Sequence, residues 1–188
     1  MKTLTAVLFA GGESRRMGRD KATLLFDGEP LWSRQLRVLR ELQPEKTLIS
    51  ARARPAWCPP EIETVLDAPP SRGPLSGLSA ALKHIRTTHL LALAIDLPEM
   101  TSAHLCGLWS LAHPGIGVVP RRGKFIEPLC AVYAREGTVA AEKALVSEDA
   151  SLHGLVGTLV ARRQIRYCAI SQIKGAIYRN VNTLDQWK

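Results

Sequence analysis

The sequence lacks the features that mark several classes of protein. Its four cysteines lie far apart and form no C-x-x-C pair, which argues against a zinc site, a redox motif and a disulfide framework. The longest apolar run, residues 90–95, is far shorter than the roughly 18 residues of a membrane-spanning helix. Residues 4–10 are also apolar, but Gly11, Gly12 and Glu13 follow them instead of a cleavage signature, so we expect a strand and not a signal peptide. We therefore expect a cytoplasmic protein without a membrane partner.

Familiar catalytic and nucleotide-binding signatures are missing as well. Neither the P-loop pattern G-x-x-x-x-G-K-[ST] nor the dinucleotide fingerprint G-x-G-x-x-G occurs, and no Ser-His-Asp array is visible. His84 and His89 flank the end of a predicted helix, where a cation would meet the negative end of the helix dipole. The other histidines show no metal-ligand spacing, and the tryptophans are too scattered for a base-stacking platform.

The composition is that of an ordinary soluble globular protein, with 188 residues of which 46% are hydrophobic and 22% are charged. This length suits one domain with a sizeable core, and no linker divides the chain, so we predict a single domain over residues 1–188. Lys and Arg number 25 against 17 Asp and Glu, which gives a net charge of +8. Such a balance favours an anionic partner, which could be a nucleic acid, a membrane surface or a phosphorylated small molecule.

Short apolar runs alternate with helical patterns over the first two thirds of the chain. Residues 90–95 form a continuous apolar run bounded by Asp96 and Pro98, which is typical of a fully buried central strand. The order of strand, helix, strand, helix predicts an α/β fold with a doubly wound, mostly parallel sheet flanked by helices. The expected strands are residues 4–10, 47–51, 63–66, 90–95, 116–120, 125–133 and 165–170, and the expected helices are residues 30–42, 73–85, 101–113, 138–146 and 152–161.

The turn after the first predicted strand is rich in glycine and in cations. Ligands of open α/β sheets bind beyond the carboxyl ends of the strands, and this turn lies there. Gly11 and Gly12 let backbone N–H groups approach an anion without interference from a Cβ atom. A solvated basic turn is the plainer interpretation. Positive charge suited to a triphosphate comes from Arg15, Arg16, Arg19 and Lys21.

Two further segments reach the same edge of the predicted sheet. Asp96 follows the buried strand, where a carboxylate is costly unless it is solvated, paired or metal-bound, and it is well placed to hold a Mg²⁺ that bridges nucleotide phosphates. A turn or capping aspartate before Pro98 is the alternative interpretation. Asp67 precedes a second glycine-rich turn, residues 73–77, which taken alone is a plain helix start with proline in its first turn.

Five segments, taken together, carry a resemblance to a known family. They are residues 9–21, Asp67 with Gly73-Pro74-Leu75-Ser76-Gly77, Asp96-Leu97-Pro98, Glu127-Pro128-Leu129 and Asn180-Val181-Asn182-Thr183. The first resembles the signature of small nucleotidyltransferases, L-A-G-G-x-S-x-R-M-G-x-D-K. The set is most similar to the molybdenum cofactor guanylyltransferase family, whose segments occur in the same order, and the late N-V-N-T favours the molybdopterin branch. Phe9 replaces the usual Leu, and Ser50 stands where the family often has Asn at the end of the second strand.

The resemblance implies a Rossmann-like nucleotidyltransferase that moves GMP from GTP to the phosphate of molybdopterin, with Mg²⁺, and releases pyrophosphate. Molybdoenzyme apo-proteins or other cofactor-biosynthesis proteins are the implied protein partners. An acceptor phosphate is mostly ionised at neutral pH, so no general base is needed. By the same resemblance, the nucleotide site comprises Phe9, Ala10, Gly11, Gly12, Lys21, Ser50, Asp67 and Asp96, the metal ligand is Asp96, and the catalytic side chains are Lys21, Asp96, Arg15 and Arg16.

Three alternatives stay open at this point. A relative with the same fold could use CTP or act on a sugar phosphate. A basic nucleic-acid-binding module would suit the charge, but no recognition helix, zinc finger or aromatic sheet motif is present, so we expect no nucleic-acid partner. A catalytically silent scaffold is the third, and the presence of Lys21, Asp67 and Asp96 argues against it.

Overall fold

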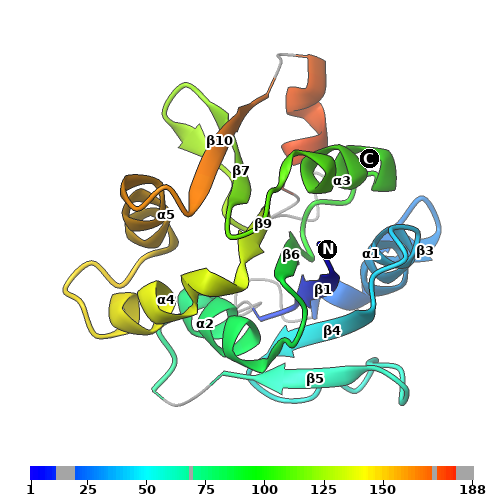
Figure 1. Ribbon diagram of the computed structural model, residues 1–188. Helices are drawn as coiled ribbons and strands as arrows, with labels where there is room; N and C mark the ends of the chain where they lie inside the picture. The colour runs from blue at the N-terminus through cyan, green and yellow to red at the C-terminus, as the bar shows by residue number, and fades with distance from the viewer. Residues whose placement is uncertain (12–19, 68–69, 171–172, 181–188) are drawn as a thin grey trace.

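The computed structural model describes residues 1–11, 20–67, 70–170 and 173–180, and its centre is an eight-stranded mixed sheet (Figure 1). The strands are β1 (Leu4–Phe9), β4 (Lys46–Ala51), β5 (Glu63–Leu66), β6 (His89–Ala94), β7 (Gly117–Arg122), β8 (Phe125–Ile126), β9 (Cys130–Ala134) and β10 (Ile165–Ala169). Their order across the sheet is β10-β7-β9-β6-β1-β4-β5, with β8 paired to β7. A separate two-stranded sheet joins β2 (Leu25–Phe26) to β3 (Glu29–Pro30).

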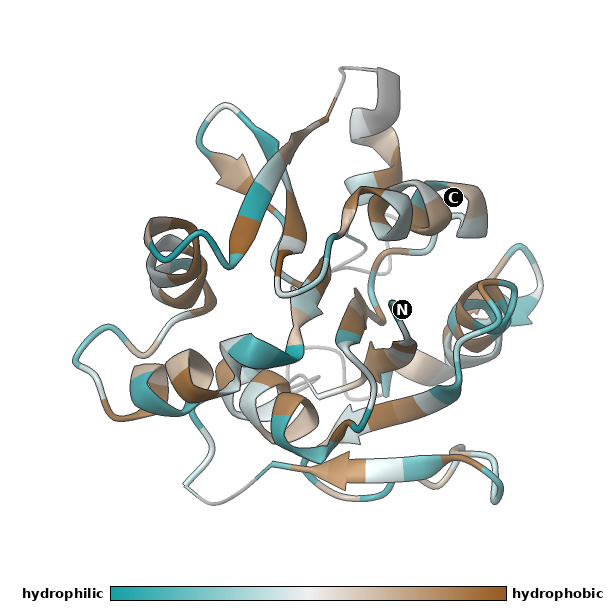
Figure 2. Cartoon of the chain, viewed as in Figure 1, coloured by the Kyte–Doolittle hydropathy of each residue, from teal (hydrophilic) through white to brown (hydrophobic). Residues whose placement is uncertain are grey.

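Helices cover both faces of the sheet. The α-helices are α1 (Leu31–Arg40), α2 (Pro74–His84), α3 (Ser102–Leu111), α4 (Thr138–Leu145) and α5 (Leu152–Ala161), and short 3-10 helices include η2 (Lys21–Thr23) and η4 (Ile173–Tyr178). α1 and α3 lie on one face of the sheet, and α2, α4 and α5 lie on the other (Figure 1). Buried side chains of the first two helices form one apolar cluster with the sheet, and those of the other three form a second. Apolar colour accordingly gathers on the strands, while the loops at the periphery carry much of the hydrophilic colour (Figure 2).

The two central strands, β1 and β6, explain why the sheet is apolar through its middle. All six residues of each strand are buried. A strand with helices on both faces has no wet side, so its sequence is a continuous apolar run instead of an alternating one. β1 pairs in parallel with both β4 and β6, and β5 pairs in parallel with β4. The predicted α/β fold with a mostly parallel sheet is therefore confirmed.

Two strands run against the others, the short β8, which pairs antiparallel with β7, and β9. β9 lies between β6 and β7 and is antiparallel to both. The single strand predicted for residues 125–133 is wrong, because residues 127–129 divide it into β8 and β9. Pro128 has no N–H to give to a ladder, and the N–H of Cys130 instead turns back to the carbonyl of Glu127 at 3.2 Å. This break leaves Glu127 at the edge where β1 and β6 end.

His89 also differs from its predicted role as a capping cation. It is the first residue of β6 and its side chain is fully buried. One ring nitrogen lies 2.9 Å from the hydroxyl of Thr88, and the other lies 2.9 Å from the carbonyl of His113. Burial lowers the pKa of His89, which favours the neutral form of the ring over a capping cation. His84, by contrast, ends α2 and pairs with Glu63 at 2.9 Å.

All four cysteines are free thiols, as their spacing predicts. Within the described ranges, none of the helices combines the length and the apolar character that crossing a membrane requires.

Candidate active site

The carboxyl end of β1 is held between its two neighbouring strands. The N–H of Ala10 donates to the carbonyl of Ser50 on β4 at 3.0 Å, and the N–H of Ile95, just after β6, donates to the carbonyl of Phe9 at 3.1 Å. Phe9 is buried and Gly11 is exposed, so the backbone emerges from the sheet at Ala10. The first predicted glycine therefore stands at the carboxyl edge of the sheet, where ligands of such folds bind.

The described chain resumes beyond this turn at Asp20. Its carboxylate accepts the N–H of Ala22 at 3.0 Å and so caps η2, which begins at Lys21. Three residues predicted for the site, Gly12, Arg15 and Arg16, lie outside the described residues, as do residues 181–183 of the N-V-N-T segment.

A glycine of α2 brings three predicted site residues together. A Cβ atom at Gly77 would lie 2.6 Å from the hydroxyl of Ser50, 3.1 Å from Oδ1 of Asp67 and 3.4 Å from the ring of Phe9. The backbone of α2 thus packs directly against these groups, and a larger residue at position 77 would displace them. The ends of β1, β4 and β5 meet the first turns of α2 at this point.

The carboxylate of Asp67 is oriented by its own loop. Its N–H donates to the carbonyl of Ala51 at 3.2 Å, which continues the register of β5 against β4. Its second oxygen, Oδ2, accepts the hydroxyl of Ser71 at 3.1 Å. One carboxylate oxygen therefore faces Ser50 and Gly77, while the other is held by the loop before α2.

Lys21, Asp96 and Glu127 form the charged part of the site. Burial raises the pKa of Asp96, and the ammonium of Lys21 acts in the opposite direction. Burial also raises the pKa of Glu127 to about 7, where the N–H of Leu129 favours the ionised form and the charge of Asp96 disfavours it. Asp96 therefore lies within electrostatic reach of both the Lys21 ammonium and the Glu127 carboxylate.

The sequence analysis predicted Lys21 and Asp96 as site residues at the carboxyl edge of the sheet, but it did not include Glu127 among them. The signal for Glu127 was present: an acidic residue directly before a proline breaks a run of strand-forming residues. What the sequence could not give is the antiparallel insertion of β9, which brings the break beside Asp96.

The donor set fits a hard divalent cation. Two half-buried carboxylates, whose pKa values are raised because their charge is poorly solvated, would be stabilised by a positive ion. Mg²⁺ takes one or two carboxylates together with substrate phosphates and keeps several waters, so it needs no complete protein cage. Among the described residues there is no cluster of three or more His, Cys, Asp or Glu that could form such a cage.

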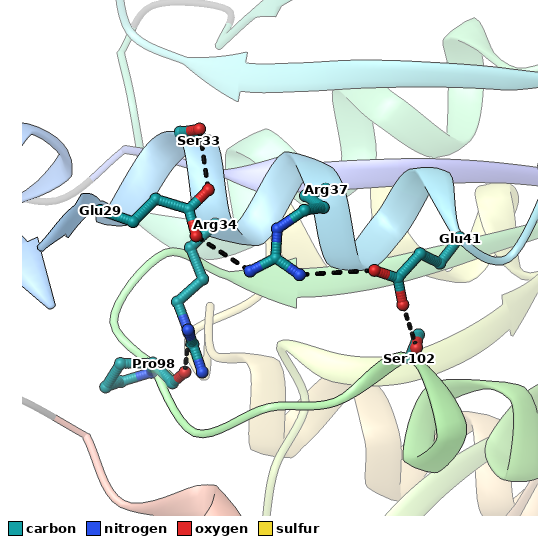
Figure 3. Close-up of polar contacts among 7 residues, drawn as sticks. All are labelled: Glu29, Ser33, Arg34, Arg37, Glu41, Pro98 and Ser102. Carbon is teal, nitrogen blue, oxygen red and sulfur yellow. Dashed lines mark hydrogen bonds and ion pairs between the residues drawn. The ribbon is translucent and has the colours of Figure 1, made fainter. Parts of the chain in front are cut away.

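Helix α1 supports the loop that carries Asp96. The side-chain amide of Gln35 donates to the carbonyl of Leu97 at 2.6 Å, and Nε of Arg34 donates to the carbonyl of Pro98 at 2.7 Å. Farther along the helix, Glu41 accepts the hydroxyl of Ser102 at the start of α3 (Figure 3). The loop after β6 is thereby tied to α1 at several points, and this fixes the direction in which Asp96 leaves the sheet.

The sequence of this chain matches a family model described as the MobA-like NTP transferase domain over residues 6–163. The chain belongs to this family. It is 38% identical, over 90% of its length and 85% of the relative's, to a probable molybdenum cofactor guanylyltransferase of Opitutus terrae. The resemblance seen in the five sequence segments is therefore confirmed, and the protein is a nucleotidyltransferase.

Solved structures share the fold of this chain. A molybdopterin-guanine dinucleotide biosynthesis protein A of Archaeoglobus fulgidus superposes with a TM-score of 0.68 at 22% identity, covering 97% of this chain and 94% of that one. A Mycobacterium tuberculosis protein in complex with manganese superposes with a TM-score of 0.63 at 17% identity, covering 90% of this chain and 88% of that one. The MobA-like fold thus extends over almost the whole of this nucleotidyltransferase.

Proposed function

We propose that this nucleotidyltransferase moves GMP from GTP to the phosphate of molybdopterin, depends on Mg²⁺ and releases pyrophosphate. The observation that carries the proposal is the position of Asp96 directly after Ile95, whose N–H bonds the end of β1, with Lys21 and Glu127 close enough to act on its charge or feel it. The names of the relatives favour guanine and a molybdopterin acceptor over other bases and acceptors. Residues 1–188 act in this proposal as one nucleotidyltransferase domain.

In the proposed reaction, an oxygen of the acceptor phosphate attacks the α-phosphorus of GTP. The new P–O bond forms as the bond from the α-phosphorus to the oxygen bridging to the β-phosphate breaks, and pyrophosphate leaves with that bond's electron pair. A phosphate monoester has a second pKa near about 6, so the nucleophile is already mostly ionised at neutral pH. The chain therefore has to hold two polyanions in line, and no side chain has to abstract a proton.

The roles that we propose combine the positions of the described residues with the family resemblance of the sequence. Backbone groups of Ala10, Gly11 and Gly12 line the nucleotide, with Phe9 beneath them. Ser50 and Asp67, which meet at α2, contact the nucleoside. Lys21, Arg15 and Arg16 neutralise the phosphates. Asp96 would hold the cation, with Glu127 as the neighbouring carboxylate, and a bound Mg²⁺ would supply positive charge that offsets the charge of the nucleotide phosphates.

The test is a pyrophosphate-release assay with molybdopterin as acceptor and GTP, CTP, ATP or UTP as donor, with and without Mg²⁺. We expect turnover with GTP and Mg²⁺, and little with the other nucleotides. Turnover with CTP in preference to GTP would indicate a cytidylyltransferase. CTP is tested because Ser50 stands where the family often has Asn. Turnover on a sugar phosphate but not on molybdopterin would refute the proposed acceptor.

We further propose that the positive charge of the chain serves the nucleotide and its acceptor and not a nucleic acid, and that the protein acts in the cytoplasm and hands its product to molybdoenzyme apo-proteins or other cofactor-biosynthesis proteins. Binding to DNA would weaken steeply between about 50 and 200 mM salt. A gel-shift titration with DNA across that range distinguishes a nucleotide-binding role of the charge from a nucleic-acid-binding one. We expect no specific shift at either salt concentration.

A further inference from the structure

Lys21 is anchored through its neighbour in the sequence by a residue from a distant loop. One oxygen of the Asp20 carboxylate accepts the N–H of Ala22 at 3.0 Å and caps η2. The other oxygen accepts the indole N–H of Trp57 at 2.7 Å. A single carboxylate therefore joins the start of the turn that carries Lys21 to the loop between β4 and β5.

The indole of Trp57 is itself fixed in position. Its ring stacks on Trp32 of α1 with centroids 5.7 Å apart and planes inclined by 18°. The loop around it is closed by Arg54, whose guanidinium donates to the carbonyl of Ile62 at 2.9 Å and to the carbonyl of Pro59 at 2.8 Å. The N–H of Trp57 is thus aimed at Asp20 by a stack on one side and by a closed loop on the other.

We propose that Trp57 is a positioning residue for Lys21. By fixing the Asp20 carboxylate, its indole N–H sets the orientation of η2, and through η2 the direction in which the Lys21 ammonium points toward the nucleotide phosphates. The proposal rests on the proposed function, in which Lys21 contacts phosphate. A hydrogen bond from an N–H to an ionised carboxylate is stronger than one between neutral groups, and two bonds to one carboxylate prevent its rotation. Without the Trp57 donor, the cap of η2 remains but its tilt against the β4–β5 loop is no longer set.

The experiment compares Trp57→Phe with Trp32→Phe. The first variant keeps an aromatic ring in the stack and removes the N–H that reaches Asp20, whereas the second changes the stack from its other side and leaves that hydrogen bond in place. The dissociation constant of GTP is measured by calorimetry in the presence of Mg²⁺, and the melting temperature of each protein is measured without nucleotide. We expect Trp57→Phe to weaken GTP binding about three- to tenfold, which corresponds to roughly 0.7 to 1.4 kcal/mol, and Trp32→Phe to change it less than about twofold.

A second pair of measurements separates positioning from general damage to the fold. In a Lys21→Ala background, Trp57→Phe should weaken GTP binding no further, because the group that it positions is gone. Asp20→Ser keeps a capping hydroxyl but is too short to reach Trp57, so it should weaken binding like Trp57→Phe, although loss of a negative charge alone would favour a triphosphate.

The outcomes distinguish this inference from the proposed function. Equal GTP affinities for Trp57→Phe and Trp32→Phe would overturn the role of Trp57, and so would an undiminished effect of Trp57→Phe in the Lys21→Ala background. Either result leaves the proposed function standing if the wild-type protein binds GTP and turns it over. A wild-type protein that binds no GTP would refute the proposed function instead. If Trp57→Phe does not fold, Asp20→Ser on its own decides the question by the same measure.

Discussion

The side-chain amide of Gln35 donates to the carbonyl oxygen of Leu97 across 2.6 Å, and neither residue is exposed to solvent. Leu97 follows Asp96 directly, so this hydrogen bond ties the loop of the proposed metal ligand to the middle of α1. The amide oxygen of Gln35 has no hydrogen-bond partner in the described part of the chain. The contribution of Gln35 therefore comes from its donor side.

Replacing Gln35 by Met should lower both stability and turnover. The two side chains have similar volumes, but Met removes one of the two donors to the buried carbonyl of Leu97 and leaves only the N–H of Met100 at 3.1 Å. The loss of this hydrogen bond costs about 0.5 to 1.5 kcal/mol of unfolding free energy. Because Asp96 adjoins that carbonyl, we expect turnover to fall more than GTP affinity does. Urea unfolding and pyrophosphate release measure the two effects. Ser33→Ala is the matched control on the same helix, since Ser33 bonds Glu29 and not this loop; equal turnover in both variants would contradict the prediction.

Asp96→Asn should remove nearly all turnover while the fold is kept. The amide cannot supply the anionic ligand that the proposed metal needs. Because burial raises the pKa of Asp96, keeping its charge in the folded protein costs free energy at neutral pH, so the variant should melt no lower than the wild type without nucleotide. Turnover within a factor of about 3 of the wild type corresponds to a change of under about 1 kcal/mol in the activation barrier. Such a result would refute the role of Asp96 as the metal ligand.

His89 should make the folded protein less stable in mild acid. Its pKa is lowered by burial, so below the ordinary pKa of about 6.5 the unfolded state takes up a proton that the folded state resists. The contribution of neutral His89 to the free energy of unfolding is complete above the unfolded pKa. It is lost as the pH falls from that value through the lower pKa of the folded state. Glu127 acts with the opposite sign, because a raised carboxyl pKa favours the folded state as the pH falls.

A difference measurement isolates the effect of His89. We expect the urea midpoint of His89→Gln to fall less between pH 7.5 and pH 5 than that of the wild type, while Glu127 contributes equally to both. His153→Gln is the control, because His153 is exposed on α5. Parallel curves for the wild type and His89→Gln would show that the buried ring does not set this pH dependence.

Ser50 provides the test of base choice. It is buried beside Asp67 and the backbone of α2, and a hydroxyl offers fewer fixed hydrogen bonds than an amide. We therefore expect the wild type to prefer GTP over CTP and ATP, and Ser50→Asn to increase that preference. A site that recognises a base through hydrogen bonds rejects the wrong base because its own polar groups are then left unpaired. Competition assays with molybdopterin as acceptor measure the ratio, and Ser50→Ala separates the loss of the hydroxyl from the change in size. An unchanged ratio in both variants means that Ser50 does not read the base.

Much of this arrangement follows from local sequence. The apolar runs of β1 and β6 predict central parallel strands, and the rule that such strands end at one edge brings Lys21, Asp96 and the glycine turn together. Ser50 on β4 and Asp67 just after β5 both approach Gly77, as the neighbouring positions of the two strands lead one to expect.

The remaining features depend on contacts between residues far apart in the chain. His89 was expected to be a cation near a helix end, but its burial is set by Thr88 and His113 and by the packing around β6. Trp57 lies 37 residues from Asp20 along the chain, and no periodicity connects them. The roles of His89 and Trp57 depend on which distant residues the fold brings next to them. The local sequence pattern does not specify those neighbours.

The antiparallel strand β9 has a consequence for the order in which the protein can be made. Until the ribosome has released residues 130–134, the buried strand β6 has no partner on the side that β9 will occupy, and its unpaired N–H and C=O groups are open to other chains. Nascent chains that end between β6 and β9 therefore carry an unpaired strand edge of the kind that promotes aggregation. Once β9 inserts, it closes that edge and gives β7 and β10 their attachment, so the second half of the sheet is built on a strand of five residues.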